Sequence, residues 1–118
     1  MLKKKYRLRK ATAFSATFRL KNCKSNDYFV MYCGSPKKDN DYPTKAGFVV
    51  SKKIHKRAVK RNKIKRRLRE IYYDLMKNNE IPSNIQNALS FIVIAKSKTL
   101  DTDFSELKIS FDDLIQKF

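Results

Sequence analysis

Residues 52–69 constrain the fold of this chain more than any other stretch, because they combine dense positive charge with a helical apolar pattern. Eleven of these eighteen residues are Lys or Arg, and none is acidic. Large apolar residues recur at i, i+4, i+7 and i+11, namely at Ile64, Leu68, Ile71 and Leu75. That spacing predicts one amphipathic helix over residues 57–78, ended by Asn78-Asn79 and Pro82.

The rest of the charge is segregated as well. Six of the first ten residues are basic, whereas residues 70–118 carry five basic and eight acidic groups. The whole chain has 28 Lys and Arg against 11 Asp and Glu, a formal net charge of +17. A solubilising surface would intersperse the two signs, so the two basic blocks indicate a surface for a polyanion. A solvated helix face with a ragged basic terminus is the alternative.

The length of the chain, 118 residues with 42% hydrophobic, predicts a single domain over residues 1–118 with one packed core. No run approaches the ~18–20 apolar residues of a membrane span. No apolar segment follows the basic start, so we expect no secretory signal, no membrane contact and a cytoplasmic location. The two cysteines, Cys23 and Cys33, and the lone His55 have no recognisable metal spacing, so we expect reduced thiols and no metal site.

The remaining pattern predicts a second long helix, a short one and three strands. Thr12 is the expected N-cap of a short helix that carries Phe14 and Phe18. Strand formers fill residues 28–33 and 46–51, and turn residues separate the two runs: Gly34, Pro36, Asn40, Asp41 and Pro43. Two strands flanking one loop predict an antiparallel pair.

The C-terminal half continues this mixed pattern. Residues 90–95 are almost all apolar, as in a strand covered on both faces. A helix is expected from Asp103 onward, with Thr102 or Asp103 as its cap and Glu106 in its first turn. The order is therefore helix, strand, strand, helix, strand, helix. This order predicts an α+β sandwich of helices on one small sheet.

The basic helix is expected to present a row of cations beside its apolar face. Arg61, Lys65 and Arg69 are spaced i, i+4 and i+8, and Asn62 and Arg66 lie on the adjoining row. Such a row can contact a phosphate backbone, and arginine adds bidentate geometry. Asn62 has two interpretations: it forms a specific hydrogen bond with the partner, or it is a capping or inert residue of the helix.

The aromatic residues Phe14, Phe18 and Tyr32 have two interpretations. A helix and a neighbouring strand could place them along one groove, where unpaired bases stack on exposed rings. From the residues alone, a place in the core is the better supported interpretation.

Catalysis finds little support in the sequence. There is one His, and no Ser or Cys has an evident His and carboxylate partner. With only two glycines, the chain has no glycine-rich phosphate loop. The carboxylate pairs at residues 101/103 and 112/113 could bind a divalent ion, but solubility groups on the surface are the expected role.

Two stretches resemble a known family. Residues 45–53, Lys-Ala-Gly-Phe-Val-Val-Ser-Lys-Lys, are similar to a glycine-containing strand that ends in a lysine pair. Residues 57–70, Arg-Ala-Val-Lys-Arg-Asn-Lys-Ile-Lys-Arg-Arg-Leu-Arg-Glu, resemble the Arg-Asn-Arg-x-Lys-Arg helix of the bacterial ribonuclease P protein subunit. Weaker matches occur in the right order along the chain, at residues 6–8, Phe14, Phe18, residues 28–32 and residues 91–96. The resemblance therefore covers the whole chain.

This resemblance implies a fold and a function. The fold is an α–β sandwich of order αβββαβα, with a small mixed sheet and a left-handed β-α-β crossover, an exception to the usual handedness. The partner is a large catalytic RNA, in a 1:1 complex, that uses bound Mg²⁺ to remove the 5′ leader of precursor tRNA. The protein supplies no catalytic residue. It binds the RNA, holds the single-stranded leader in a cleft and raises the affinity for substrate and Mg²⁺.

The resemblance also implies which residues act. Nine are implied to bind RNA: Lys52, Lys53, Arg57, Arg61, Asn62, Lys63, Lys65, Arg66 and Arg69. Phe14, Phe18 and Tyr32 are implied to line the leader cleft, which reverses the interpretation from the residues alone. Two positions depart from the pattern. Lys63 replaces an Arg and loses its fork, and Arg67 stands where an apolar residue is common.

Two rival functions follow from the charge alone. A general RNA-binding or ribosome-associated protein would bind structured RNAs uniformly with a steep salt dependence. A DNA-binding protein is less well supported, because no turn-helix partner precedes the basic helix. The sequence leaves open whether residues 1–10 are ordered without RNA, although a basic arm of this kind usually is not.

Overall fold

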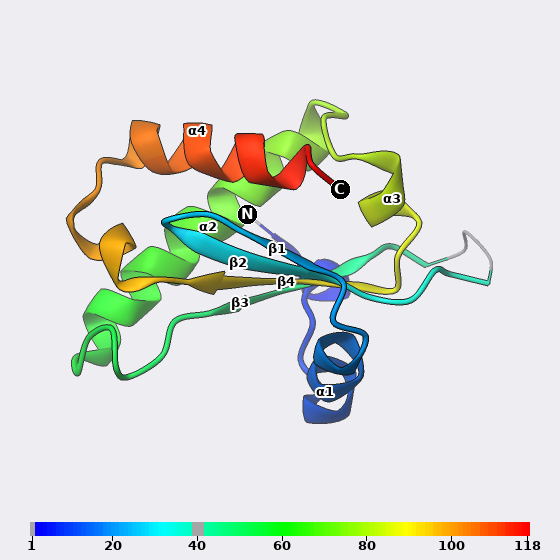
Figure 1. Cartoon of the computed structure of the whole chain (residues 1–118), viewed down its shortest axis with the longest axis horizontal. Coiled ribbons are helices and arrows are strands. Elements are labelled where there is room, and N and C mark those ends of the chain that lie inside the picture. Colours follow the sequence, from blue (N-terminus) through cyan, green and yellow to red (C-terminus); the bar gives the residue numbers. More distant parts are fainter. Residues whose placement is uncertain (1, 39–41) are drawn as a thin grey trace.

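A four-stranded sheet forms the middle layer of the molecule, with helices on both sides of it (Figure 1). The computed structural model describes residues 2–38 and 42–118, so Asn40 and Asp41 of the expected turn lie outside the described residues. In chain order the elements are η1 (Lys4–Tyr6), α1 (Ala11–Arg19), β1 (Cys23–Ser25), β2 (Phe29–Cys33), β3 (Lys45–Val49), α2 (Ala58–Lys77), α3 (Ser83–Gln86), β4 (Ser90–Ala95), η2 (Ser97–Asp101) and α4 (Phe104–Ile115).

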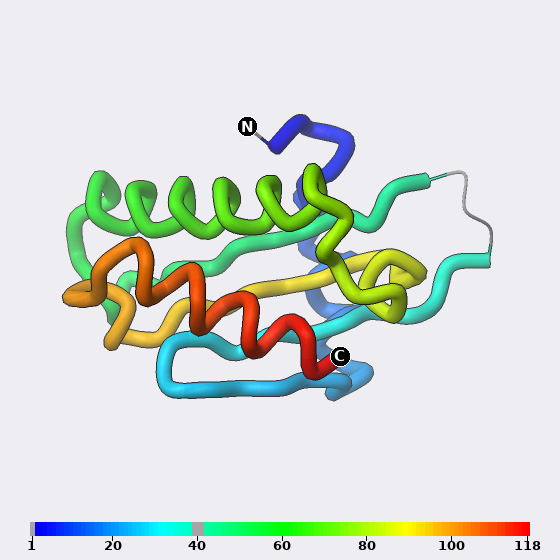
Figure 2. Tube along the Cα trace, turned by 90° about the horizontal axis from the view of Figure 1, so that it is seen from above, coloured from blue at the N-terminus to red at the C-terminus, as the bar shows by residue number. Residues whose placement is uncertain are grey.

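Helices α2 and α4 cover one face of the sheet, and α1 lies beneath the other (Figures 1 and 2). The alternation along β2 follows from this: Phe29 and Met31 are fully buried, whereas Val30 and Tyr32 are half-buried. The core fills the layer between the sheet and the two long helices. The opposite face is only partly covered. The predicted α+β sandwich is confirmed.

Aromatic rings tie the sheet to the helices across this core. Phe29 of β2 meets Phe111 of α4 edge to face, with ring centroids 5.6 Å apart. Tyr72 of α2 stacks on Phe91 of β4, with centroids 5.8 Å apart. Such pairs add specific geometry to the burial of large apolar surfaces. Helix α2 is therefore held firmly by its inner face, which leaves its outer residues free for other contacts.

The strand order differs from the prediction. The order is β1-β2-β4-β3, so the expected antiparallel pairing of residues 28–33 with 46–51 is wrong. Strand β4 lies between them, antiparallel to β2 and parallel to β3. The physical reason is the composition of β4: it is the most apolar strand, and a central position covers both of its faces and both of its edges.

The connection β3–α2–β4 joins two parallel neighbours and is left-handed. With α2 in front of the sheet and both strands pointing up, β4 lies to the left of β3 (Figure 2). Most crossovers of this kind are right-handed. The handedness agrees with the one that the family resemblance implied.

Helix α2 has nearly the predicted bounds, and its end has an identifiable cause. Asn79 adopts a left-handed backbone with φ of 58°, which Asn tolerates better than most residues. The Glu80 N–H donates to the Leu75 carbonyl at 2.8 Å, and the Asn79 N–H to the Met76 carbonyl at 3.2 Å. These two bonds satisfy carbonyls that the last helical turn would otherwise leave unpaired.

Two predictions about the N-terminal part were wrong or incomplete. Thr12 is not a cap: α1 already begins at Ala11, Lys10 precedes it, and no side chain caps the helix. The basic N-terminal segment is also not a free arm, because two of its residues are anchored to the rest of the domain. Leu2 is only 2% exposed, and the Leu8 N–H donates to the Ala46 carbonyl at 2.8 Å, which docks this segment on the free edge of β3.

Candidate nucleic-acid interface

The outward side of α2 carries a continuous row of polar and cationic side chains. At about 100° per residue, these positions follow one flank of the buried face. We call this row the cationic strip, and it consists of Arg61, Asn62, Lys65, Arg66 and Arg69. Asn62 and Arg66 are exposed, whereas the other three are half-buried because they border the core. The predicted alignment of these five residues on one helix flank is confirmed by the position and length of α2.

Arg61 has a local structural role in addition to its place in the strip. Its Nη1 donates to the carbonyls of His55 and Lys56, at 2.9 Å each. Those carbonyls belong to the turn before α2, which also carries Lys52 and Lys53. Arg61 therefore positions that turn, a role that helical spacing alone does not reveal.

The other predicted RNA-binding residues lie around the strip. Lys52, Lys53 and Arg57 are exposed, just before α2 begins. Lys63 is exposed too, but helical spacing places it beyond Arg66, about 60° from that residue and about 160° around the helix from Lys65. Lys63 and the half-buried Arg67 thus do not belong to the cationic strip.

No side chain of the strip forms an ion pair with an acidic residue that the structure describes. Within residues 2–38 and 42–118, the one side-chain ion pair joins Lys98 to Asp27 at 3.6 Å. Burial lowers the pKa of the Arg69 guanidinium, and the nearby positive charge of Arg7 lowers it further. Arg69 nevertheless stays charged at neutral pH, so an approaching phosphate would relieve this repulsion.

Three aromatic side chains form a second surface on the partly covered face of the sheet. The rings of Phe14 and Phe18, one turn apart on α1, have centroids 6.3 Å apart. Phe18 then meets Tyr32 of β2 edge to face at 4.9 Å. We call these three residues the aromatic row. All three are half-buried, so part of each ring remains open to a ligand.

Gly47 lets the first ring of this row approach the backbone of β3. A Cβ atom at this position would lie 2.6 Å from Cζ of Phe14 and 2.7 Å from its Cε1. Those distances are shorter than any ordinary carbon contact. The absence of a side chain at Gly47 therefore sets the position of the Phe14 ring.

This contact predicts the outcome of a small substitution. In Gly47→Ala the ring of Phe14 must turn away from the new methyl group, since the end of a side chain moves more easily than the backbone of β3. We expect a loss of unfolding free energy of about 1 kcal/mol or less. Single-stranded RNA should bind as weakly as it does to Phe14→Ala. Denaturation and RNA titration of both variants check this, and unchanged RNA binding in Gly47→Ala would contradict the role of the ring position.

The aromatic row and the cationic strip meet in one hollow at the edge of β3. This hollow has a volume of ≈300 Å³, and Phe14, Gly47, Lys65 and Arg69 line it. Arg7 and Arg9 line it as well. These two arginines were not among the predicted site residues. Their place in a basic terminus that pairs with β3 could have suggested them, but only once the sheet edge was known.

Comparison with known families decides the assignment of the chain. Its sequence matches the family described as Ribonuclease P over residues 2–118. This chain belongs to the ribonuclease P protein family. The ribonuclease P protein component of Listeria monocytogenes is 36% identical over 109 residues, which cover 92% of this chain and 84% of that relative. The component of Shouchella clausii is 31% identical over 116 residues, which cover 98% and 88%.

Solved structures of the family share the fold. The RNase P protein of Thermotoga maritima superposes with a TM-score of 0.76 at 27% identity, covering 95% of this chain and 96% of that one. The RNase P protein of Staphylococcus aureus gives a TM-score of 0.73 at 27% identity, with coverages of 94% and 93%. As a ribonuclease P protein component, this chain takes part in tRNA processing. It belongs to an endoribonuclease in which its partner is RNase P RNA.

Potential metal ligands are dispersed over the part of this ribonuclease P protein that the structure describes. No group of three or more His, Cys, Asp or Glu residues comes together among residues 2–38 and 42–118. Nδ1 of His55 accepts the Arg57 N–H at 3.0 Å. Cys23 is exposed and Cys33 is buried, and both are free thiols. None of the helices in the described part combines the length and apolar character needed to cross a membrane.

Proposed function

We propose that this chain binds RNase P RNA through the cationic strip and holds the single-stranded 5′ leader of precursor tRNA against the aromatic row. The observation that carries the proposal is the hollow at the edge of β3. There Phe14 of the row and Lys65 and Arg69 of the strip line one volume of ≈300 Å³. A strand that stacks its bases on the row can thus place its phosphates beside the strip.

In this proposal the residues of the chain bind and orient RNA but break no bond. The strip neutralises phosphates of the catalytic RNA, and the guanidinium groups of Arg66 and Arg69 suit bidentate contacts. The aromatic row offers sequence-tolerant stacking, as a leader of variable sequence requires. We further propose that Mg²⁺ bound by the RNA supplies the chemistry of hydrolysis. We further propose a 1:1 complex and a cytoplasmic location.

Cleavage of 5′-labelled precursor tRNA at limiting Mg²⁺ tests this function. Three mixtures are compared: bacterial RNase P RNA alone, this protein alone, and both together. We expect cleavage at the mature 5′ end in the combined mixture only. If the protein changes neither the rate nor the Mg²⁺ requirement of the RNA, a general RNA-binding protein becomes the better explanation.

The aromatic row makes a separate prediction about the leader. In Tyr32→Ala, binding of precursor tRNA should weaken by about 5- to 150-fold, because one stacked base contributes about 1–3 kcal/mol. Binding of mature tRNA should not change, since it lacks the leader. Tyr42→Ala is the matched control, because Tyr42 is 71% exposed and lies outside the row. Equal losses for precursor and mature tRNA in Tyr32→Ala would refute the leader contact.

A further inference from the structure

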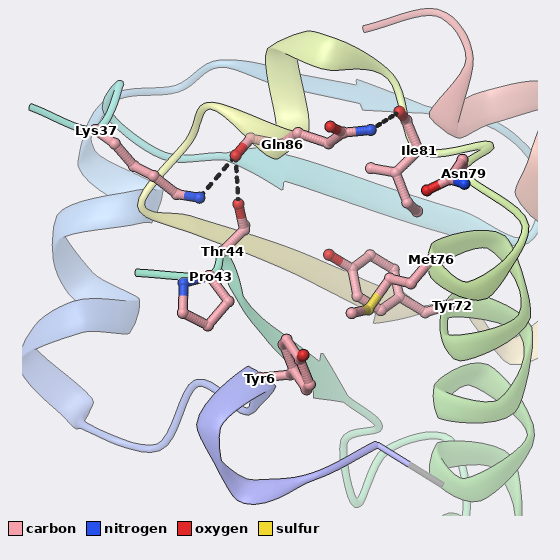
Figure 3. A pocket seen from close by; sticks show the side chains of 9 residues that line it. All are labelled: Tyr6, Lys37, Pro43, Thr44, Tyr72, Met76, Asn79, Ile81 and Gln86. Carbon is pink, nitrogen blue, oxygen red and sulfur yellow. Dashed lines mark hydrogen bonds between the residues drawn. The ribbon is translucent and has the colours of Figure 1, made fainter. Parts of the chain in front are cut away.

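A second cavity, of ≈270 Å³, lies between η1, the start of β3, the end of α2 and α3 (Figure 3). None of its lining residues belongs to the cationic strip or to the aromatic row. Cavities for drug-sized ligands measure roughly 300–1,000 Å³. This cavity is therefore of a size for one small ring system.

The hydroxyl of Tyr72 is the distinctive group in the cavity. The Tyr72 side chain is only 2% exposed, and its ring is held by the stack on Phe91 and an edge contact with Phe48 at 5.9 Å. Figure 3 shows the hydroxyl pointing into the cavity. It makes no hydrogen bond to any residue that the structure describes. No buried side-chain nitrogen or oxygen among the described residues lacks a hydrogen-bond partner, so the Tyr72 oxygen is open to the water of the cavity. An acceptor atom of a ligand can replace that water and bond to the hydroxyl.

Several polar groups around the cavity are already paired. The Gln86 carbonyl accepts from Lys37 Nζ at 2.8 Å and from Thr44 Oγ1 at 3.0 Å (Figure 3). Gln86 Nε2 donates to the Ile81 carbonyl at 2.7 Å. The Tyr72 hydroxyl, which has no hydrogen bond to a described residue, stays available as a donor, and burial raises its pKa, which keeps its proton in place at neutral pH.

The walls and the surroundings of the cavity favour a flat, partly polar ligand near phosphates. The ring of Tyr6, the ring of Pro43 and the thioether of Met76 provide apolar contact surfaces. Lys5 Nζ lies 5.0 Å from the centre of the Tyr6 ring, and Lys37 lines the cavity from another side. Cations beside an aromatic surface suit a nucleotide whose base stacks and whose phosphate stays outside.

We propose that this cavity binds one unstacked nucleobase of the RNA partner, with an acceptor atom of the base bonded to the Tyr72 hydroxyl. The choice of RNA as the source rests on the proposed function and on the net charge of +17. A free nucleoside has the same ring chemistry. The two sources are separated by the experiments below.

The first experiment titrates the free, full-length protein with adenosine or cytidine and follows backbone amide NMR signals. Nucleosides lack phosphate, so they cannot bind through charge alone. We expect shifts at Thr44, Asn79 and Gln86, which surround the cavity, and none with ribose. Shifts only along α1 and β2, or no saturable shift at all, overturn the proposal. Since no RNA is present, this result is independent of whether precursor tRNA is cleaved.

The second experiment compares Tyr72→Phe with Tyr28→Phe. The Tyr28 hydroxyl donates to Glu106 at 2.7 Å, whereas the Tyr72 hydroxyl has no described partner. Tyr72→Phe should therefore leave the midpoint of denaturation unchanged and weaken RNase P RNA binding about three- to tenfold, as expected for one hydrogen bond. Tyr28→Phe should show the reverse. If nucleosides bind but Tyr72→Phe leaves RNA binding unchanged, the RNA source is refuted.

Discussion

Replacing Lys65, Arg66 and Arg69 together with Gln should weaken the binding of RNase P RNA on the order of 1,000-fold or more. Each of the three would lose a charge-assisted hydrogen bond, worth about 1.5–3 kcal/mol when a phosphate is contacted. The dependence of log affinity on log salt should become shallower by about two to three, since about 0.9 counterion is released per phosphate. The fold itself should not suffer, because removing like charges spaced i, i+4 slightly favours a helix.

A matched control exists on the other flank of the same helix. Lys60, Lys63 and Arg67 carry the same total charge, but helical spacing places them away from the hollow. The fold-loss of RNA affinity on replacing these three residues with Gln should be less than a tenth of the fold-loss in the strip variant. RNA titrations of both triple variants over a range of KCl concentrations make the comparison. Equal losses would mean that charge alone matters, as in a general RNA-binding protein, and would also restore Lys63 to the contact surface.

Helix α2 could be predicted nearly to the residue because its determinants are local. Ile64, Leu68 and Ile71 repeat with helical period, and an Asn in the left-handed region ends the helix. The same local periodicity predicted the strip, since residues four apart on a helix always share a flank. Which flank of α2 borders the hollow at the edge of β3 depends on how the helix packs on the sheet, and this packing is not a local property of the sequence.

Strand pairing could not be predicted because it is decided between distant segments. Residues 28–33 and 46–51 are separated by one loop, so pairing them was the simplest hypothesis. The structure instead inserts β4, whose residues Phe91, Ile92 and Val93 are all fully buried. In the central position, the side chains on both faces of β4 are removed from water. The free energy gained by this burial exceeds the entropy cost of the longer connection between paired strands.

The candidate site shows the same division. Phe14 and Phe18 could be placed on one helix face from their spacing, but their contact with Tyr32 needed the packing of α1 on the sheet. Gly47 leaves room for the Phe14 ring, and this role is visible only from the short distance between that ring and a Cβ atom placed at residue 47. The docked segment with Arg7 and Arg9 escaped prediction because its charge suggested a free arm, whereas Leu2 and Leu8 anchor it.

The second large effect concerns the inner face of α2. Leu68 is fully buried against the sheet, so Leu68→Ala should lower the free energy of unfolding by about 2–5 kcal/mol, the cost of lost burial plus a cavity. Domains of this size are stable by roughly 5–15 kcal/mol, so a large share of the total is at stake. Val59→Ala on the same helix is the control. Val59 is 77% exposed, and its change should stay within about 0.5 kcal/mol. Urea denaturation followed by circular dichroism measures both.

Binding of RNA should partly rescue this variant, because the strip and Leu68 share one helix. A ligand that binds only the folded chain at 100 times its Kd adds about 2.7 kcal/mol of stability. Leu68→Ala should therefore unfold at a higher urea concentration when RNase P RNA is present, whereas the strip variant should gain little from the same RNA. If RNA stabilises both variants equally, it binds elsewhere than on α2. If it stabilises neither, the folded form of α2 is not what the RNA recognises.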